Sequence, residues 1–593
     1  MTAAKIKRAV AVFALVVGGV LVLSGPVGRA QDGVPSPPPS PPSSPPPSPA
    51  GGEEALRLVA HQDVDSKSFT TSGSCATCHA QSDRAQAMRD SKGRGIAPYD
   101  LWQSTMMANS ARDPLWRAVV SVEVAATPSR KQEIEAKCLR CHSPMAHTEA
   151  SRAGVTLGLD ILYGDDAKAQ LALDGVSCTV CHQIQPGNLG KPESFSGHYE
   201  IGTERVIFGP HAEPVPGPMR AFTNFTPQEG QHVRKSALCA TCHTLFTEAY
   251  DAEGKLTGQT LPEQTPYLEW RNSLFNDEDD GKGASCQSCH VPTHDQDGKT
   301  IKTRIAHAPP GFDFPFVNER EPFGRHIFVG ANTLIPAILR DNAEELRPRA
   351  SKEAFDATLA AAKDQLQNRT ARLSLADVKR RGQALEFAVE VRTMTGHKFP
   401  TGHPTRRAWL QVVVSDASGR VVFSSGSFDS AGRILGGAGK PLRAESAGGP
   451  TYRHRDSITS QDQVQVYESI MADAAGEATY LLIRGGSYLK DNRILPIGWK
   501  PGHQDAKQIQ PVGLGADPNF KGGRDRTHYA LELPAGVQGP LKVEARLLYQ
   551  VLGSRYADEL FRYDTREIRA FKRYWSAADR RPVSVARVEK VLR

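Results

Sequence analysis

The chain has no cysteine to spare for disulfide bonds. All ten of its cysteines lie in five copies of the pentapeptide Cys-x-x-Cys-His. Neither a disulfide framework nor a zinc ribbon needs a histidine after every second cysteine. A thioredoxin-like site is excluded as well, because no βαβ pattern surrounds the copies. The copies are Cys75, Cys78 and His79; Cys138, Cys141 and His142; Cys178, Cys181 and His182; Cys239, Cys242 and His243; and Cys286, Cys289 and His290.

This spacing is the attachment signature of c-type haem. The two thiols add across the vinyl groups of the porphyrin, and two intervening residues let both sulfurs reach one edge of the ring. The histidine that follows reaches the iron as its proximal ligand. We therefore expect five covalently bound c-type haems, with the ten cysteines as attachment points and the five motif histidines as proximal iron ligands.

No cysteine follows the apolar run at the N-terminus, which excludes a lipoprotein anchor. The run extends from Ala9 to Leu23 behind a basic start, and Gly28 and Ala30 are small residues at the positions that a signal peptidase reads. We expect residues 1–30 to be a signal peptide cleaved after Ala30. The alternative is an uncleaved inner-membrane anchor. Attachment of c-type haem takes place outside the cytoplasm, so the chain is expected to be periplasmic or extracytoplasmic.

Residues 31–55 lack the apolar residues that a core needs. They contain the run VPSPPPSPPSSPPPSPA at positions 34–50, which predicts a solvated polyproline II segment. Fully extended at roughly 3.1 Å per residue, it would reach about 50 Å. It is either a tether for the haem domain or a disordered leader, and the sequence favours neither.

The remaining residues are too many for one core, so we expect several domains. All five motifs fall within 56–332, which predicts an N-terminal haem domain of short helices and irregular loops. Residues 333–365 have the spacing of a helical connector, and residues 556–593 predict a final helix and a tail.

Residues 366–555 have the character of an all-β domain. Short runs with alternating apolar residues are separated by Gly, Asp or Pro turns. In one of them, Leu385, Phe387, Val389 and Val391 would face one way, while the residues between them would face the other. Several such strands predict a β-sandwich.

The charge is nearly balanced. The chain is formally +7, and four of its basic residues lie in the first 30. Nucleic-acid binding is therefore not expected. Several arginines are instead suited to pair with haem propionates. They are Arg140, Arg205, Arg220, Arg234, Arg304, Arg320 and Arg325.

The segment from about 73 to 330 resembles the multihaem cytochrome c superfamily, which includes the tetrahaem cytochromes of nitrifying bacteria and hydroxylamine oxidoreductase. The strings that carry the resemblance are LWQSTMMANSARDP, CLRCHSPMAH, DGVSCTVCH, HVRKSALCATCHTL, EQTPYLEW, CQSCH and PFGRHIFVGAN. The resemblance implies a haem-packed, mainly helical and irregular multihaem cytochrome domain, followed here by the all-β sandwich-like domain. Catalytic relatives commonly carry more haems, and some use a proximal lysine, whereas all five motifs here end in histidine.

The ligand on the other side of each iron decides between electron transfer and substrate binding. The resemblance singles out His232 and His326 as distal ligands, with His147 as the next choice. His397 and His403 lie in a loop between two predicted strands, from which the β domain could reach back to a haem. Met106 or Met107 could supply a thioether ligand, although helical core packing explains this pair at least as well.

We therefore expect a pentahaem electron carrier that passes single electrons between redox partners, either soluble redox proteins or a membrane quinol or cytochrome. No catalytic residue is predicted. The alternative is a multihaem oxidoreductase acting on a small nitrogen or sulfur compound at one five-coordinate haem. A third hypothesis makes the β domain a docking module. Membrane association is expected only through an uncleaved N-terminal segment.

Overall fold

Short helices joined by long loops make up the first part of the computed structural model, which describes residues 56–279 and 281–592. The predicted signal peptide and the predicted linker, residues 31–55, both lie outside the described residues. The helices are α1 (Ser72–His79), α2 (Pro98–Trp102), α3 (Pro114–Ala126), α4 (Lys131–His142), α5 (Pro144–Arg152), α6 (Ala167–Leu173), α7 (Cys178–Cys181), α8 (Pro216–Thr223), α9 (Ser236–Ala240), α10 (Pro266–Arg271) and α11 (Cys286–His290).

The longest of these helices begins at a strong N-terminal signal. Pro114 occupies the first turn of α3, and the Asp113 carboxylate accepts hydrogen bonds from the backbone N–H groups of Leu115 and Trp116. Two small sheets also belong to this region. They are the parallel pair β1 (Val206–Gly209) and β2 (Thr226–Glu229), and the antiparallel pair β3 (Leu245–Tyr250) and β4 (Leu256–Gln264).

Three helices follow where the sequence predicts a connector. They are α12 (Ile335–Asp341), α13 (Ala343–Leu346) and α14 (Lys352–Arg369). In α14, Phe355, Leu359, Ala362 and Leu366 recur at helical spacing and are buried. This connector leads directly into the first strand of the β-rich region.

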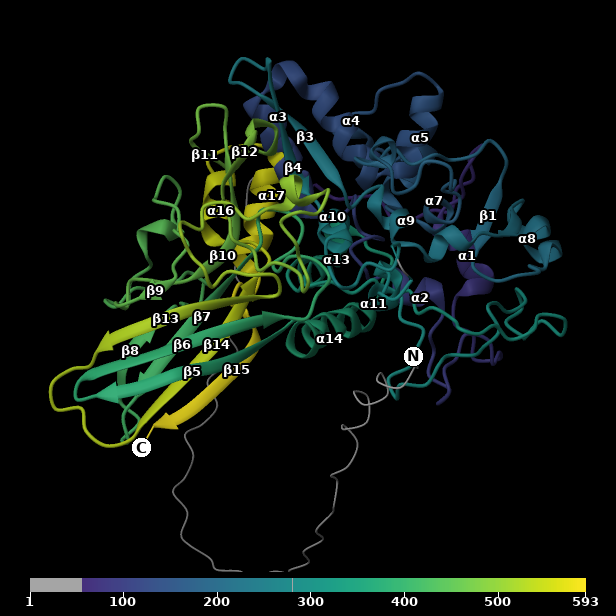
Figure 1. Cartoon of the computed structure of the whole chain (residues 1–593). Helices are drawn as coiled ribbons and strands as arrows, with labels where there is room; N and C mark the ends of the chain where they lie inside the picture. The colour runs from purple at the N-terminus through teal and green to yellow at the C-terminus, as the bar shows by residue number, and fades with distance from the viewer. Residues whose placement is uncertain (1–55, 280, 593) are drawn as a thin grey trace, which may run out of the picture. The chain divides into compact units, whose positions relative to one another are not determined.

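Two open sheets form the β-rich region, as the sequence predicts. Figure 1 shows the long strands β5, β6 and β13 of the four-stranded sheet lying side by side. The second sheet has seven strands, with β7 paired to β10, β14 and β8. The strands are β5 (Ala371–Arg381), β6 (Ala384–Thr393), β7 (Arg407–Ser415), β8 (Val421–Ser425), β9 (Ser457–Ile458), β10 (Val466–Ala472), β11 (Ala478–Thr479), β12 (Ser487–Asp491), β13 (Arg524–Glu532), β14 (Leu541–Gln550) and β15 (Val583–Leu592).

The two sheets share one core, which makes the region sandwich-like. Leu385, Phe387, Val389 and Val391 of β6 are buried together with Val412 of β7. The alternation predicted for β6 is therefore present. One detail differs, because Ala388 on the opposite face is also buried.

The same core extends into the helical region. Leu115, Val119 and Val122 of α3 belong to it, as do residues of α12, α14, α16 (Ser554–Leu560) and α17 (Arg566–Ala577). The helix α17 packs against α3. The helical and β-rich regions are thus joined by shared apolar packing.

The C-terminal segment differs from its prediction in one respect. A helix is present there, but the predicted tail is strand β15, which pairs along its length with β14. Arg587 and Glu589 lie on one face of this edge strand and Lys590 on the other, and all three are exposed, so the strand lacks a clear alternation of apolar and polar residues. Among the helices described, none is both long and apolar enough to span a membrane.

Candidate haem sites

Each haem motif is carried by a short helix or begins at one. The five lie on α1, α4, α7, α9 and α11. In four of the five motif histidines, Nδ1 hydrogen-bonds with a backbone carbonyl oxygen. A carbonyl oxygen can only accept, so Nδ1 carries the proton and donates it. The bonds run from His79 to Ile305 (2.9 Å), from His142 to Ser110 (3.0 Å), from His182 to Phe208 (2.6 Å) and from His290 to Val329 (2.8 Å).

These hydrogen bonds determine which ring nitrogen can bind a metal. With the proton on Nδ1, the lone pair of Nε2 is free for iron. Burial lowers the pKa of His142 and of His290 to about 4, so both imidazoles are neutral near pH 7, as metal ligands must be. Thiol pairs and oriented neutral imidazoles are the donor set that a c-type haem requires, so these residues fit the group. His243 differs, since no hydrogen bond of its ring is found among the described residues.

The motif thiols also lie close to one another. The Cys75 thiol lies close enough to interact with Cys178, the Cys141 thiol with Cys242, and the Cys239 thiol with Cys286. Burial, followed by the nearby Cys242, raises the pKa of the Cys181 thiol to about 12. Motif 1 therefore contacts motif 3, motif 3 adjoins motif 4, and motifs 2 and 5 each contact motif 4.

His326 lies opposite a motif histidine. Its ring centroid is 6.2 Å from that of His182, and the two ring planes differ by 25°. Its Nδ1–H donates to the carbonyl of Gly324 (3.0 Å), which leaves Nε2 free, as in His182. Two imidazoles bound to one metal at about 2.0–2.1 Å would have ring centroids roughly 6 Å apart. The pair therefore has the separation that one shared iron would require.

The family described as "Cytochrome c554 and c-prime" matches residues 74–183, which contain three of the five motifs. The match supports a c-type cytochrome character for this part of the chain. Among solved structures, the penta-heme cytochrome c552 from Thermochromatium tepidum is similar, at 16% identity and a TM-score of 0.47. That alignment covers 91% of this chain and 100% of the other. No curated protein matches. The relationship to hydroxylamine oxidoreductase and the nitrifier cytochromes stays a prediction.

The other histidines predicted as distal ligands differ in which ring nitrogen is free. His397 is half-buried and donates Nδ1–H to the carbonyl of Lys398 (3.1 Å), so its Nε2 is free. His403 instead accepts the backbone N–H of Thr405 at Nδ1 (3.3 Å), which puts the proton on Nε2. In His232, Nε2–H donates to the carbonyl of Ile184 (2.9 Å).

The remaining candidates have weaker geometry. Burial, together with Arg140 and His198, lowers the pKa of His147 to about 4. Met106 and Met107 are half-buried, and Met106 packs against the core that includes Leu115. Core packing thus accounts for Met106, and the roles of all three residues at a haem stay predictions.

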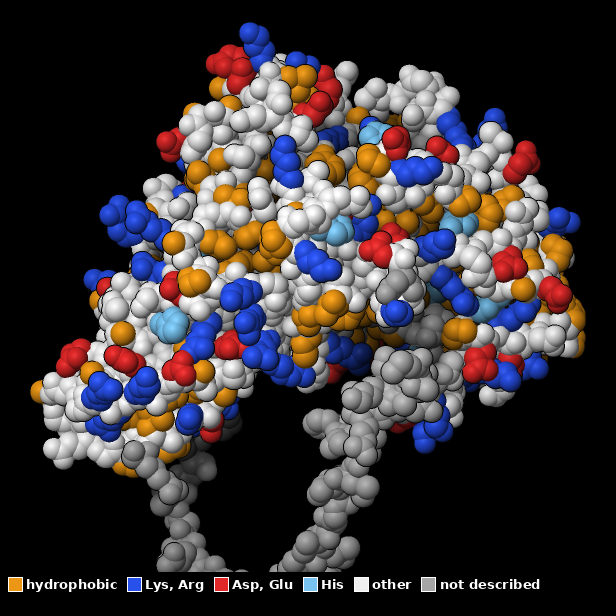
Figure 2. Space-filling model, in the orientation of Figure 1, with side chains coloured by type: hydrophobic (Ala, Val, Ile, Leu, Met, Phe, Trp, Pro, Cys, Tyr) orange, Lys and Arg blue, Asp and Glu red, His pale blue; other side chains and the backbone are white. Residues whose placement is uncertain are grey.

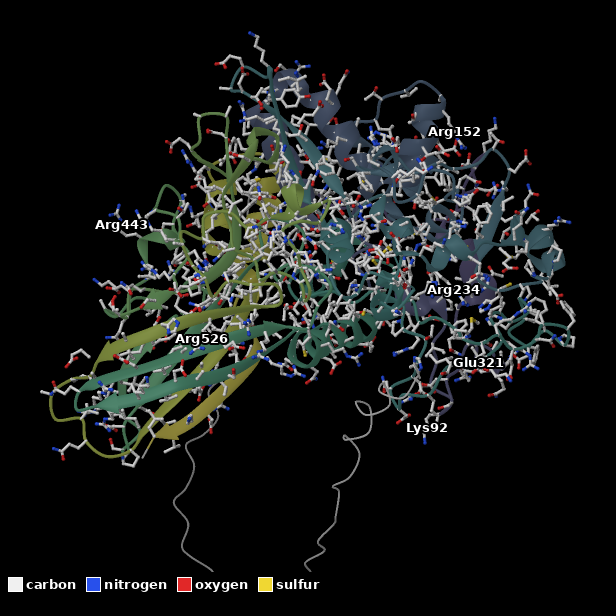
Figure 3. All side chains as sticks on the ribbon, viewed as in Figure 1. Lys92, Arg152, Arg234, Glu321, Arg443 and Arg526 are labelled. Atoms are coloured by element: carbon white, nitrogen blue, oxygen red, sulfur yellow. The ribbon has the colours of Figure 1, made fainter. Side chains whose placement is uncertain are left out.

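The arginines expected to pair with haem propionates differ in whether they already have a partner within the chain. Arg205 pairs with Asp65 (2.7 Å), whereas the buried Nε atoms of Arg320 and Arg325 have no partner among the described residues. Figure 3 places Arg234 in the helical region, whereas Arg443 and Arg526 lie in the β-rich region. Figure 2 shows basic, acidic and apolar side chains interspersed over the visible face, without a continuous basic surface there.

A cavity of about 30 Å³ lies beside His403, between the start of β7, β10 and α16. The ring of Tyr556 lines it and meets the ring of His403 at 6.0 Å between centroids. The hydroxyls of Tyr480 and Tyr556 and the Nε atom of Arg555 are buried without a hydrogen-bond partner in the described part of the chain. A space of this size holds one or two water molecules or a very small solute.

One histidine–aspartate cluster in the β-rich region has the spacing of a metal site, but both ring nitrogens of its histidine are engaged in hydrogen bonds. His454, Asp517 and Asp525 bring their ligand atoms within 4.8 Å of one another. Gln465 and Asn492 both donate to Nδ1 of His454, so Nε2 carries the proton and donates it to Asp517 (2.8 Å). The cluster is a buried hydrogen-bond network, because neither ring nitrogen is free for a cation.

Several residues around the second motif carry no sequence signal. The ring of Trp116 stacks on that of His142, with centroids 4.3 Å apart and planes 4° apart. Burial raises the pKa of the Cys138 thiol to about 12, and the buried carboxyl groups of Glu263 and Glu123 add to this rise. Only the fold brings these two carboxyl groups to the motif.

Proposed function

We propose that this cytochrome is an electron carrier with five c-type haems, one on each motif. The observation that carries the proposal is the proximity of the motif thiols, which interact in pairs that join all five motifs. Since each thiol would bind the edge of a porphyrin, neighbouring haems would lie edge to edge at distances short enough for electron tunnelling. The expected order runs from motif 1 through motif 3 to motif 4, with motifs 2 and 5 branching from motif 4.

Rapid injection of less than one electron per molecule tests this order. We expect the electron to distribute over the haems according to their potentials by the earliest time at which spectra can be recorded. A haem that fills separately and slowly would contradict a continuous path. Haem content is measured in the same sample and should be five per chain.

We further propose that His326 is the distal ligand of the iron bound by His182, which makes that haem low-spin. Substituting His326→Ala should convert one haem to the high-spin form in the electron paramagnetic resonance (EPR) spectrum and raise its midpoint potential. His294→Ala is the matched control, because His294 is an exposed histidine whose ring hydrogen-bonds with the hydroxyls of Thr293 and Thr300. An unchanged spin state in the His326 variant would refute the assignment.

An extracytoplasmic location and a redox-protein or membrane quinol partner complete the proposal. Support comes from the haem motifs and from the predicted signal peptide. Fractionation of the native host, with haem staining of the periplasmic and membrane fractions, tests the location and separates a cleaved signal from a retained anchor.

A second candidate function is substrate binding at the haem of the second motif. Burial, followed by the charges of Arg406 and His142, lowers the pKa of His403 to about 3, so the rings of His403 and His142 lie close enough to interact. In this reading, Nε2–H of His403 would hydrogen-bond a small nitrogen or sulfur compound on an open iron, with the unpartnered Tyr556 hydroxyl nearby. A high-spin signal in the unaltered oxidised protein, unchanged by His403→Ala, would favour this function. An entirely low-spin protein would exclude it.

A further inference from the structure

The segment that joins β6 to β7 is anchored by a ring of four buried charges. Lys398 is fully buried, and its Nζ lies 2.6 Å from the Asp491 carboxylate. Arg493 donates to the same carboxylate from Nε (2.8 Å) and Nη2 (2.7 Å). Glu269 of α10 closes the ring, because it pairs with Arg493 (3.3 Å) and accepts the backbone N–H of Lys398 (2.9 Å).

This ring of charges fixes the position of the loop and adds little to the stability of the fold. Two cations and two anions cancel, but each was taken out of water, so an apolar replacement of similar volume is often no less stable. The charged groups make directional hydrogen bonds, and these hold the backbone of Lys398 against α10 of the haem region. The residue held next to Lys398 is His397.

The anchored segment packs against residues that lead into the fifth motif. Gly396 is so close to Trp270 and Phe275 that an added Cβ would come within 3.1 Å of each. Trp270 donates its indole N–H to the carbonyl of Ala284 (2.9 Å), two residues before Cys286. His397 follows Gly396 and is half-buried, and its free Nε2 has the same protonation pattern as the proximal histidines.

We propose that His397 is the sixth ligand of the iron bound by His290, and that Lys398, Asp491, Arg493 and Glu269 position it. The inference rests on the proposed attachment of a haem to the fifth motif. His397 lies close enough to both His290 and His243 for the imidazoles to interact, so the iron of the fourth motif is the competing partner. The β-rich region would thereby supply one ligand to a haem of the helical region.

Substitution of His397→Gly, with imidazole added back, tests the ligand. We expect the variant to gain a high-spin signal of about one haem in five relative to the unaltered protein, and imidazole to return it to low-spin. His528→Gly, on β13, is the matched control and should leave the spectrum unchanged. An unchanged spin count in the His397 variant overturns the proposal. So does a crystal structure of the imidazole-soaked variant with the imidazole on the fourth iron.

Haem content separates this failure from failure of the proposed function. Five haems per chain with no spin change would reject the ligand and leave the carrier standing, whereas fewer than five in the unaltered protein would reject the carrier itself. The positioning role is tested by Asp491→Asn and Asp491→Glu. We expect Asn to raise the high-spin fraction of the same haem several-fold at equal haem content and equal circular dichroism, and Glu to restore most of it. Equal spectra for the two variants would refute the positioning role.

Discussion

At the scale of single residues, the haem sites combine groups that are fixed by covalent chemistry with groups that are fixed only by the fold. The motif cysteines and histidines could be predicted from the sequence, because thioether formation dictates their spacing. The carbonyls of Ile305, Phe208 and Val329, which orient three proximal histidines, could not, because backbone atoms carry no sequence signal. The same limit applies to the buried carboxyl groups beside the second motif.

One of these carboxyl groups, that of Glu123, should make the midpoint potential of the nearby haem depend on pH. Burial raises the pKa of Glu123 to about 8, against two backbone N–H donors that lower it. An ionised carboxylate favours ferric over ferrous iron, so the midpoint potential of the nearby haem should fall as the pH rises through about 8. The expected fall is on the order of tens of millivolts, the size of a charge interaction over ~10 Å at an effective dielectric constant of about 20.

Spectroelectrochemical titration between pH 6 and pH 10 measures this effect. Glu123→Gln should remove the pH dependence of that haem. Glu133→Gln is the control, because Glu133 lies exposed on α4 and pairs with Arg130, and it should leave the dependence intact. A dependence that survives in the Glu123 variant would contradict the assignment.

At the scale of the elements, alternation was sufficient to predict the sandwich strands but not their partners. The spacing of Leu385, Phe387, Val389 and Val391 is visible in the sequence because one face of β6 is buried. Which strand pairs with which could not be read, since several strands have equivalent patterns. Strand β15 was missed because both of its faces carry charged residues.

Strand β7 offers a matched pair that tests this packing. Val412 is fully buried in the shared core, whereas its neighbour Val413 points to the other, partly exposed face. Val412→Ala should lower the free energy of unfolding by roughly 2 kcal/mol, through lost burial and the cavity left behind. Val413→Ala should cost well under 1 kcal/mol. Denaturant unfolding of the holoprotein measures both, and equal losses would contradict the assigned faces.

At the scale of the whole molecule, the described residues 56–592 are held together by a core that both regions share. The sequence predicts that an all-β domain begins near residue 366, and the first strand of the β-rich region does begin at Ala371. It does not reveal that α3, α12 and α14 pack into the same core as β6 and β7. Contacts between segments hundreds of residues apart leave no periodicity in either one.

This shared core predicts that the haem region does not stand alone. A chain ending at residue 365 would expose the apolar faces of α3 and α14, including Val119 and Phe355. We expect it to accumulate poorly as holoprotein and to be digested by protease at least tenfold faster than the full chain, because its opening free energy falls by more than 1.4 kcal/mol. A truncated protein with full haem content and unchanged protease resistance would show that the regions fold independently.

The half-burial of the motif thiols gives haem attachment an order in time. Of the ten motif cysteines, nine are partly buried in the finished fold and Cys289 is exposed, and all ten precede residue 290 in the chain. The strands of the β-rich region and the His397 segment are made later, because synthesis proceeds from the N-terminus. The enzyme that attaches haem can therefore reach all five motifs before the core shared by the two regions has formed.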